Sequence, residues 1–345
     1  MYRVGIVGDG YTAVELLRLL AGHPQLEPVY VSSIVNVGRR VDEVYPQFFG
    51  SCNLLFQPTD VNLIAEQCEA VFLAVPHGES AVLVNELLPL GVKCIDLGAD
   101  FRLQDPGVYA NYYGLKHPHP ELLPEAVYGL PELYRRAIKA ANLIANPGCF
   151  PTSAIIPLAP LLAAKLVAPE GLIIDSKSGV TGAGRSAKVN NLFCEVNDGF
   201  HAYGVGTHRH APEIAHILSE AAGSTAELTF TPHLVPMNRG IFTTSYARLT
   251  AGATENDVRA ALLNSYEDEP FIRILPPGVI PHSKWVYGSN FVFIGVSVNE
   301  PKRQVILLSV IDNLTKGASG QAIQNLNIML GIEETAGLTA LGVMP

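Results

Sequence analysis

The chain has 345 residues, of which 48% are hydrophobic and 16% are charged. That composition provides a large apolar core and excludes an intrinsically disordered chain, and the length is typical of two domains. The net charge of −9 at pH 7 excludes a nucleic-acid-binding surface as the main function. The five cysteines are widely spaced, so they indicate neither a disulfide framework nor a Cys-x-x-Cys metal pattern.

The N-terminal apolar segment Tyr2–Val7 is short and is followed at once by glycine, so we expect no signal peptide. A membrane-spanning helix needs a run of about 18 apolar residues. The longest candidate, Ala154–Leu172, is interrupted by Pro157, Pro160 and Lys165. We therefore expect no membrane span and a cytoplasmic protein.

The first hundred residues alternate apolar segments with amphipathic ones. Strands that are apolar throughout, with helices between them, are typical of a parallel sheet covered on both faces. We therefore predict a doubly wound α/β domain. The predicted strands are Tyr2–Val7, Leu26–Val31, Ala70–Ala74 and Lys93–Asp96, and the predicted helices are Thr12–Gly22, Leu63–Cys68 and Ser80–Leu90.

The middle of the chain has a different pattern, with mainly strands and few helices. It predicts an α+β domain with a mostly antiparallel sheet over residues 149–313. A final helix at Ser319–Leu330 would pack back on the first domain, which then comprises residues 1–148 and 314–345. The predicted strands are Leu172–Asp175, Glu227–Thr231, Ile241–Arg248, Phe291–Asn299 and Gln304–Ile311, and the predicted helices are Pro212–Glu220 and Glu255–Ser265.

A glycine-rich loop joins the first predicted strand to the first predicted helix. Its spacing is Gly-x-Gly-x-x-Ala, the small-residue form of the dinucleotide fingerprint. The two glycines allow a tight turn and close approach to a pyrophosphate, and the helix N-terminus offers N–H groups to the phosphates. A purely structural turn is the alternative. We predict cofactor contacts at Gly8, Gly10, Tyr11, Thr12 and Ala13.

The residues after the second strand help to choose the cofactor. An NAD enzyme usually ends this strand with an acidic residue that binds the ribose 2′-OH. Here the segment Val31–Arg40 contains no acid, and the first one is Asp42. Ser33, Arg39 and Arg40 suit a 2′-phosphate through charge-assisted hydrogen bonds, although a solvated arginine pair is the alternative. We predict NADP.

Cys149 is the candidate nucleophile. The apolar strand Leu143–Ala145 leads to a turn at Pro147 and Gly148, and a helical run begins at about Thr152. Cys149 therefore lies at or near a helix N-terminus, where the dipole favours a thiolate and the N–H groups can hold an oxyanion. The remaining cysteines are typical of small buried hydrophobes: Cys52, Cys68, Cys94 and Cys194.

A thiol nucleophile needs a proton partner, and two histidines are candidates. In an extended segment, His208 and His210 point the same way. Glu213 follows in the first turn of the next helix, where it orients one imidazole or complements the helix dipole. No convincing set of further ligands accompanies the pair, so we predict no metal. The pattern does not decide between the two histidines, with a slight preference for His208.

Seven short sequence motifs, spread over nearly the whole chain, together indicate a known protein family. They are Asp96–Arg102, Tyr128–Glu132, Asn146–Thr152, Ser176–Arg185, His208–Glu213, Pro232–Gly240 and Lys316–Ala322. In this order they resemble the N-acetyl-γ-glutamyl-phosphate reductases, a family related in fold and chemistry to the aspartate-semialdehyde dehydrogenases. One departure is the Gly8–Ala13 loop, which is one residue shorter than that of the family, and its effect on NADP versus NAD preference stays open.

The resemblance implies reduction of N-acetyl-L-glutamyl 5-phosphate by NADPH to the 5-semialdehyde and phosphate, in arginine biosynthesis. The reaction would proceed through a thioester on Cys149, with His208 or His210 as general acid. The second domain would also join subunits into a homodimer or homotetramer. Candidate ligands of the substrate's phosphate and carboxylate are Arg102, Lys177, Arg185 and Arg209, and further candidate cofactor contacts are Gly182, Gly184 and Asn313.

Two alternatives stay open on the sequence. A reductase of another acyl phosphate, of aspartyl or aminoadipyl type, would need the same thiol, cofactor and phosphate site. A Cys–His acyl hydrolase would release a free acid and would need no nucleotide, against which the Gly8–Ala13 loop argues.

Overall fold

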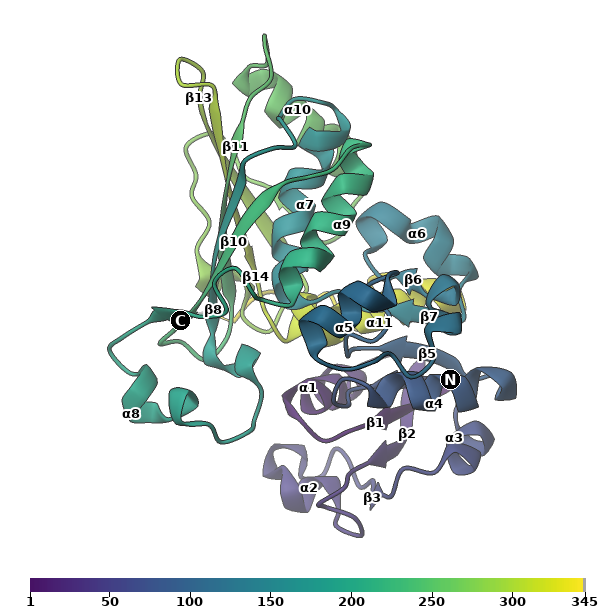
Figure 1. Ribbon diagram of the computed structural model, residues 1–345. Coiled ribbons are helices and arrows are strands. Elements are labelled where there is room, and N and C mark those ends of the chain that lie inside the picture. The colour runs from purple at the N-terminus through teal and green to yellow at the C-terminus, as the bar shows by residue number, and fades with distance from the viewer. Residues whose placement is uncertain (344–345) are drawn as a thin grey trace. The chain divides into compact units, whose positions relative to one another are not determined.

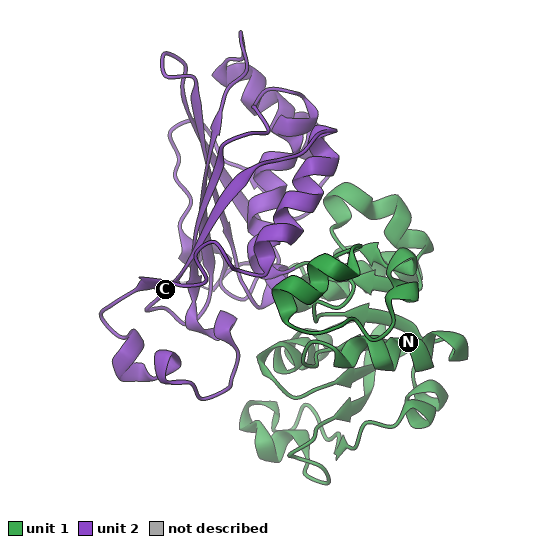
Figure 2. Cartoon of the chain, viewed as in Figure 1, with its two compact units in different colours: residues 1–147, 318–339 green, residues 148–317, 340–345 purple. Residues whose placement is uncertain are grey.

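A computed structural model describes residues 1–343 of the chain. The first of its two units consists of Met1–Pro147 and Ala318–Thr339 (Figure 2). The second consists of Gly148–Gly317 and, among the described residues, 340–343. The predicted boundaries at 148/149 and 313/314 lie close to these, but the prediction assigns the segment from Ala340 to the other domain.

The first unit contains a seven-stranded sheet in which every neighbouring pair is parallel (Figure 1). Its order is β3-β2-β1-β4-β5-β7-β6, so the chain winds outward in both directions from a switch point between β1 and β4. The predicted doubly wound fold class is confirmed. The strands are β1 (Tyr2–Val7), β2 (Leu26–Ser32), β3 (Phe56–Gln57), β4 (Ala70–Leu73), β5 (Lys93–Asp96), β6 (Val127–Tyr128) and β7 (Leu143–Ala145).

The helix α11 (Gly320–Leu330) completes the first unit from the far end of the chain, where it contacts α6 and α1. This helix is buried along nearly its whole length, so the side-chain amides of its Gln and Asn residues need hydrogen-bond partners. Gln321 and Asn325 both donate to the carbonyl oxygen of Gly129. The other helices of this unit are α1 (Tyr11–Leu20), α2 (Val41–Val44), α3 (Val61–Gln67), α4 (Glu79–Leu87), α5 (Pro106–Tyr113) and α6 (Pro131–Ala140).

The second unit contains a seven-stranded mixed sheet in the order β12-β13-β14-β11-β8-β10-β9. Four neighbouring pairs are antiparallel and two are parallel, as the mostly antiparallel prediction requires. The strands are β8 (Leu172–Gly179), β9 (His201–Ala202), β10 (Leu228–Val235), β11 (Ile241–Arg248), β12 (Ile272–Ile274), β13 (Val292–Asn299) and β14 (Gln304–Ile311). The helices are α7 (Cys149–Ala163), α8 (Phe193–Val196), α9 (His210–Ala222) and α10 (Glu255–Tyr266).

The two faces of this second sheet have different surroundings. The hydroxyls of Ser153 on α7 and Ser176 on β8 both lie within hydrogen-bond distance of Thr243 Oγ1 on β11, at 2.7 and 2.8 Å. The helix α7, with α9 beside it, therefore covers the face that carries Ser176 (Figure 1). Because side chains alternate along a strand, Ile173 and Lys177 belong to the opposite face.

The helix α7 is buried almost from end to end although it contains two prolines, Pro157 and Pro160. A proline at position 160 has no N–H to donate to the carbonyl of Ile156. The hydroxyl of Tyr266, the last residue of α10, donates to that carbonyl oxygen instead, at 2.5 Å. This contact satisfies a buried polar group that the proline leaves without its helical partner.

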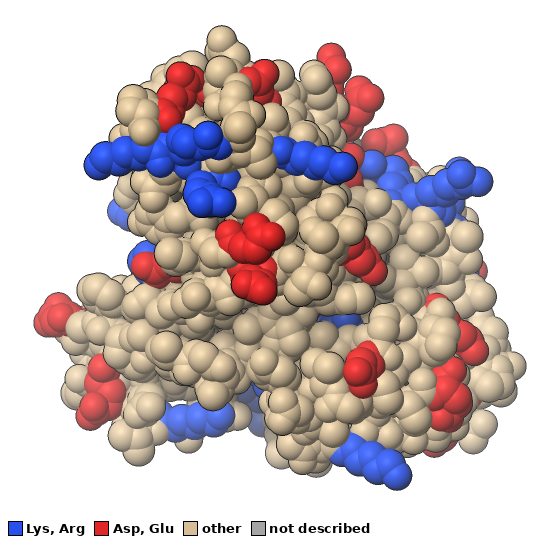
Figure 3. All heavy atoms as spheres, turned by 45° about the horizontal axis from the view of Figure 1, so that its top comes forward, with Lys and Arg blue, Asp and Glu red and all other residues tan. Residues whose placement is uncertain are grey.

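Charged side chains occupy only part of the face drawn in Figure 3, and acidic and basic residues are interspersed on it. Within residues 1–343, no helix is long and apolar enough to span a membrane.

Replacement Tyr266→Phe is expected to lower the free energy of unfolding by about 1–3 kcal/mol, because the buried Ile156 carbonyl loses its donor. Urea titration of wild type and variant measures this. Tyr246→Phe, on the less buried face of β11, removes a hydroxyl of the same kind and is expected to change stability by less than about 0.5 kcal/mol. Equal effects of the two substitutions would contradict the role given to Tyr266.

Candidate active site

Cys149 is the first residue of α7, and Gly148 is the residue that caps the helix. The predicted helical run from Thr152 therefore begins three residues earlier, and the thiol lies directly at the helix N-terminus. The cap has no side-chain hydrogen bond to the helix. The first N–H groups of α7 are thus directed toward the region where a thiolate or an oxyanion would develop. Cys149 is half-buried, so its sulfur is enclosed without being sealed from solvent.

Two residues of α9 contact the backbone directly before Cys149. The N–H of Gly148 donates to Oε1 of Glu213 at 2.8 Å, and Glu213 is 1% exposed. A methyl group on Gly148 would place its carbon 2.5 Å from Nε2 of His210. Only glycine fits there, because the imidazole already occupies that space. The structure therefore brings Cys149, His210 and Glu213 together at the N-termini of two neighbouring helices.

A third close approach comes from the chain after β14. A methyl group on Gly317 would place its carbon 2.8 Å from Cβ of Cys149 and 3.2 Å from the carbonyl oxygen of Asp312. The backbone at Gly317 therefore lies against the cysteine. The sequence signal for this contact was the glycine in the Lys316–Ala322 stretch, but glycine alone does not tell what approaches it.

His208 has different surroundings from His210. Its ring makes edge contacts with Phe150, Tyr203 and Phe230 at centroid distances of 5.4–5.7 Å. Burial lowers the pKa of His208 to about 4, and the adjacent Arg209 guanidinium adds to this effect. The imidazole is therefore neutral at pH 7, and its Nδ1 accepts the N–H of His210 at 3.1 Å.

Tyr203 is a neighbour of the site that the sequence did not reveal. Its pKa is raised by burial and by the negative charge of the Cys149 thiolate, while Arg209 lowers it. The phenol therefore lies close enough to Cys149 and Arg209 for their charges to act on it. It comes from the segment after β9, which has no recognisable motif, and only the fold places it beside the cysteine.

Of the four remaining cysteines, Cys68 and Cys94 are buried as predicted and Cys52 is half-buried, whereas Cys194 is exposed on the short helix α8, so the prediction of a small buried hydrophobe is wrong for Cys194. Burial raises the pKa of Cys68 to about 11 and also raises that of Cys94 and Cys52. These thiols are therefore poor nucleophiles at neutral pH. In the part of the chain that the structure describes, no group of three or more His, Cys, Asp or Glu side chains is arranged to hold a metal ion.

The four cationic side chains predicted to bind the substrate's phosphate and carboxylate lie in different environments. Arg102 is 8% exposed, and its guanidinium donates to the carbonyl oxygens of Asn146 and Leu97 at 2.7 and 3.1 Å. Lys177 pairs with Asp175 at 2.9 Å on the sheet face opposite to α7, so the fold does not bring it to Cys149. Arg185 and Arg209 are exposed side chains of the second unit.

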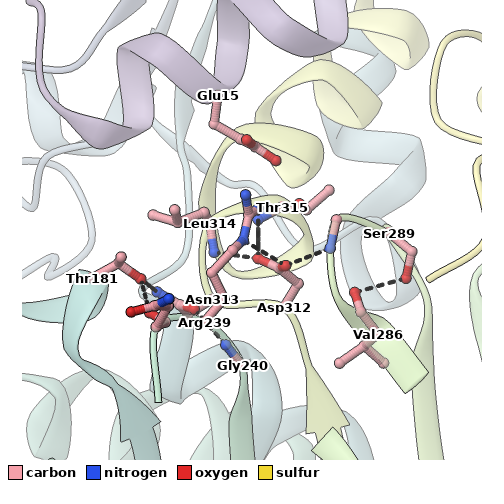
Figure 4. Close-up of polar contacts among 12 residues, drawn as sticks. Glu15, Thr181, Arg239, Gly240, Val286, Ser289, Asp312, Asn313, Leu314 and Thr315 are labelled. Atoms are coloured by element: carbon pink, nitrogen blue, oxygen red, sulfur yellow. Dashed lines mark hydrogen bonds and ion pairs between the residues drawn. The ribbon is translucent and has the colours of Figure 1, made fainter. Parts of the chain in front are cut away.

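A polar network fixes the chain after β14 in the second unit (Figure 4). The carboxylate of Asp312 is fully buried, pairs with Arg239 at 2.9 Å and accepts the N–H groups of Leu314 and Thr315. The next residue, Asn313, accepts the N–H of Gly240 and donates to the hydroxyl of Thr181. Asn313 thereby anchors the loop that contains Gly182 and Gly184, and these three candidate cofactor contacts lie together in the second unit.

The loop Gly8–Ala13 has the geometry that a dinucleotide requires. Gly8 has φ +117°, and a methyl group on it would lie 2.3 Å from the carbonyl oxygen of Ala74, so this position demands glycine. A methyl group on Gly10 would meet nothing within 4 Å, which leaves room for a phosphate beside the N-terminus of α1. Ala13 is buried. The residues present therefore fit the pyrophosphate of a nicotinamide dinucleotide.

Comparison with known proteins agrees with this geometry. A family model described as the NAD-binding domain of semialdehyde dehydrogenase matches residues 3–141, and one described as the dimerisation domain matches residues 149–313. Proteins named N-acetyl-gamma-glutamyl-phosphate reductase from Geobacter sp. (strain M21) and Moorella thermoacetica are 50% and 46% identical to the chain, with full coverage of both chains.

The fold is also that of solved structures. Aspartate semialdehyde dehydrogenase II of Vibrio cholerae, complexed with ASA, superposes with a TM-score of 0.74 over 96% of this chain and 98% of that chain, at 16% identity. The aspartate semialdehyde dehydrogenase of Candida albicans with NADP gives a TM-score of 0.70 over 96% and 99%, at 14% identity.

The chain is a member of the semialdehyde dehydrogenase family, and within it belongs to the N-acetyl-γ-glutamyl-phosphate reductases. The predicted family, the oxidoreductase class and the NAD(P)-binding Rossmann domain are thereby confirmed. The matched dimerisation domain supports the predicted association of subunits.

Replacement His208→Gln is expected to reduce the dependence of stability on pH. The unfolded chain binds a proton on His208 near pH 6.5, whereas the folded chain resists protonation until about pH 4. The wild type therefore loses stability as pH falls through this range, by about 2–3 kcal/mol from this group, and the variant does not. Urea titrations at several pH values measure the difference. His282→Gln, at an exposed site, is expected to keep the wild-type dependence, and an unchanged dependence in His208→Gln would contradict the depressed pKa.

Proposed function

We propose that the chain reduces N-acetyl-L-glutamyl 5-phosphate with NADPH to N-acetyl-L-glutamate 5-semialdehyde and phosphate, a step of arginine biosynthesis. The observation that carries this proposal is the position of Cys149 at the N-terminus of α7, with His210 and Glu213 against the residue before it. The relatives named N-acetyl-gamma-glutamyl-phosphate reductase support the choice of acyl phosphate.

We assign each step of the reaction to a group of the site. The Cys149 thiolate attacks the acyl carbonyl, the carbon–oxygen bond to phosphate breaks, and a thioester remains on sulfur. The N–H groups at the start of α7 stabilise the oxyanion formed in this attack. NADPH, which the Gly8–Ala13 loop would hold, would supply the hydride that reduces the thioester carbonyl. Departure of the Cys149 sulfur as thiolate then releases the aldehyde.

We assign the proton transfer to His210 rather than to His208. Nε2 of His210 lies against Gly148, whereas the ring of His208 is enclosed by aromatic side chains and has a pKa of about 4. A group with so low a pKa is a poor donor at neutral pH. Glu213, by accepting the N–H of Gly148, positions the turn that presents Cys149.

Among the cationic side chains, Arg209 and Arg185 are our candidates for the substrate's phosphate and carboxylate. Arg209 is supported by its electrostatic influence on Tyr203 and His208, which surround the site. Arg102 has a positioning role, because its bond to the Asn146 carbonyl restrains the turn that leads to Cys149. We further propose that the enzyme is cytoplasmic, since its nucleophile needs a reducing compartment. We also propose that it is a homodimer or homotetramer, because a dimerisation-domain model matches residues 149–313.

The reverse reaction tests this function. Phosphate-dependent oxidation of N-acetylglutamate 5-semialdehyde with NADP is expected to have a higher kcat/KM than oxidation of aspartate semialdehyde. Cys149→Ala is expected to abolish turnover and to leave NADPH binding nearly intact, because the cofactor loop does not include the thiol. A preference for aspartate semialdehyde would overturn the substrate assignment, and full activity without Cys149 would overturn the thioester.

His210→Asn is expected to lower kcat by about 10²–10⁴-fold, with little change in NADPH affinity, because the site loses its proton carrier. His208→Gln is the matched comparison, and its loss is expected to be much smaller because this ring does not face Gly148. Steady-state kinetics measure the loss of kcat in both variants, and NADPH titration measures their affinity for the cofactor. The opposite order of the two losses would assign the proton transfer to His208.

A further inference from the structure

The loop that follows β1 contains an acidic residue, Asp9, at the end of the sheet where the ribose is expected. The strands β1 and β2 are parallel neighbours, with Val7 paired to Ser32, so the segments after both strands emerge side by side (Figure 1). Asp9 follows β1 by two residues, and Ser33 follows β2 directly. The acid that usually recognises a 2′-OH stands at the end of β2. In this chain no acidic residue stands at the end of β2, and the acidic residue at this end of the sheet is Asp9, in the loop after β1.

The carboxylate of Asp9 occupies one donor that the sequence assigns to a 2′-phosphate, Ser33, together with the nearby side-chain amide of Asn36. Its Oδ2 accepts the hydroxyl of Ser33 and the amide of Asn36, both at 2.7 Å. Ser33 and Asn36 are 4% and 8% exposed, so these donors have little access to other partners. The hydroxyl of Tyr45 donates to the backbone carbonyl of Asp9 and holds the loop in this position.

The two arginines provide less positive charge at this place than the sequence suggests. Arg40 makes a two-bond ion pair with Asp42, at 2.9 and 2.6 Å, and its Nη2 also donates to Asn53. Arg39 donates to Oδ1 of Asn36 at 3.3 Å, on the other side of the amide that Asp9 holds. The local balance is therefore one carboxylate, Asp9, against one arginine, Arg39.

We propose that Asp9 is a specificity-determining residue that lets this chain use NAD as well as NADP. A 2′-OH can donate to the carboxylate, as at the acidic residue of NAD enzymes. A 2′-phosphate brings a charge of about −1.5 to −2 toward that carboxylate and must compete with it for Ser33 and Asn36. Arg39 offsets part of this repulsion, so both cofactors are bound and neither is strongly excluded. The inference rests on the proposed function only in taking a nicotinamide dinucleotide as the cofactor.

Nucleotide binding to the full chain tests this proposal without any turnover. The probes are 2′,5′-ADP and 5′-AMP by calorimetry, and NADPH and NADH by fluorescence titration. For wild type, the dissociation constants within each pair are expected to agree to within about tenfold. Asp9→Asn keeps the shape of the side chain and removes its charge, so the preference for the phosphorylated member is expected to rise by about tenfold. Asp9→Ser is the second variant, with a change in the same direction.

A matched control removes one charge elsewhere in the same unit. Glu27→Gln lies at the start of β2, at the opposite end of the strand from Ser33, and is expected to leave the preference unchanged. A wild-type preference for 2′,5′-ADP above about a hundredfold would overturn the proposal, as would an unchanged ratio in Asp9→Asn and Asp9→Ser. Failure of all four probes to bind would overturn the dinucleotide site as well, whereas the thioester on Cys149 is judged separately by the activity of Cys149→Ala.

Discussion

The hydrogen bond from the N–H of Gly148 to the carboxylate of Glu213 is the contact on which the chemistry of this chain depends. It joins the cap of α7 to the first turn of α9, so the proposed nucleophile, Cys149, and its proposed proton partner, His210, are held at adjoining helix ends. His210 lies against the same glycine, and Gly317 lies against Cys149 from the other side. A side chain at either glycine would displace the reacting groups, and preorganised geometry of this kind is where enzymes gain most of their rate.

The rest of the second unit stabilises that corner. A helix as apolar as α7 must be buried on all sides, and the mixed sheet and its neighbouring helices bury it. Hydroxyls satisfy the polar groups that this burial creates: Thr243 links Ser153 to β8, and Tyr266 donates to the carbonyl freed by Pro160. The nucleophile therefore projects from one of the most completely packed elements of the chain. Its position is restrained by the whole domain rather than by a flexible loop.

Local patterns predicted the fold class and most of the longer elements, because apolar strands separated by amphipathic helices admit few arrangements. The strand Ile241–Arg248 was predicted at its observed bounds, whereas α5 was missed because its apolar residues do not form a clear stripe of 3.6-residue period. The helix α6 was missed although its apolar and charged residues do lie on opposite sides of the helix. Cys149 was found because a turn and a helix flank it in sequence. The roles of Lys177 and Arg40 depend on Asp175 and Asp42, whose partnerships follow from strand register and loop geometry rather than from motif. Tyr203 and Asp9 were missed as site residues for the same reason.

The central claim is a covalent intermediate on Cys149, and trapping that intermediate tests it most directly. Incubation of the enzyme with N-acetylglutamate 5-semialdehyde and NADP, without phosphate, is expected to release one equivalent of NADPH per site. The thioester then has no acceptor, so peptide mass spectrometry should find an N-acetylglutamyl adduct on the peptide that contains Cys149, cleaved by hydroxylamine. A burst of NADPH with an unmodified Cys149, or an adduct on another residue, would contradict the account.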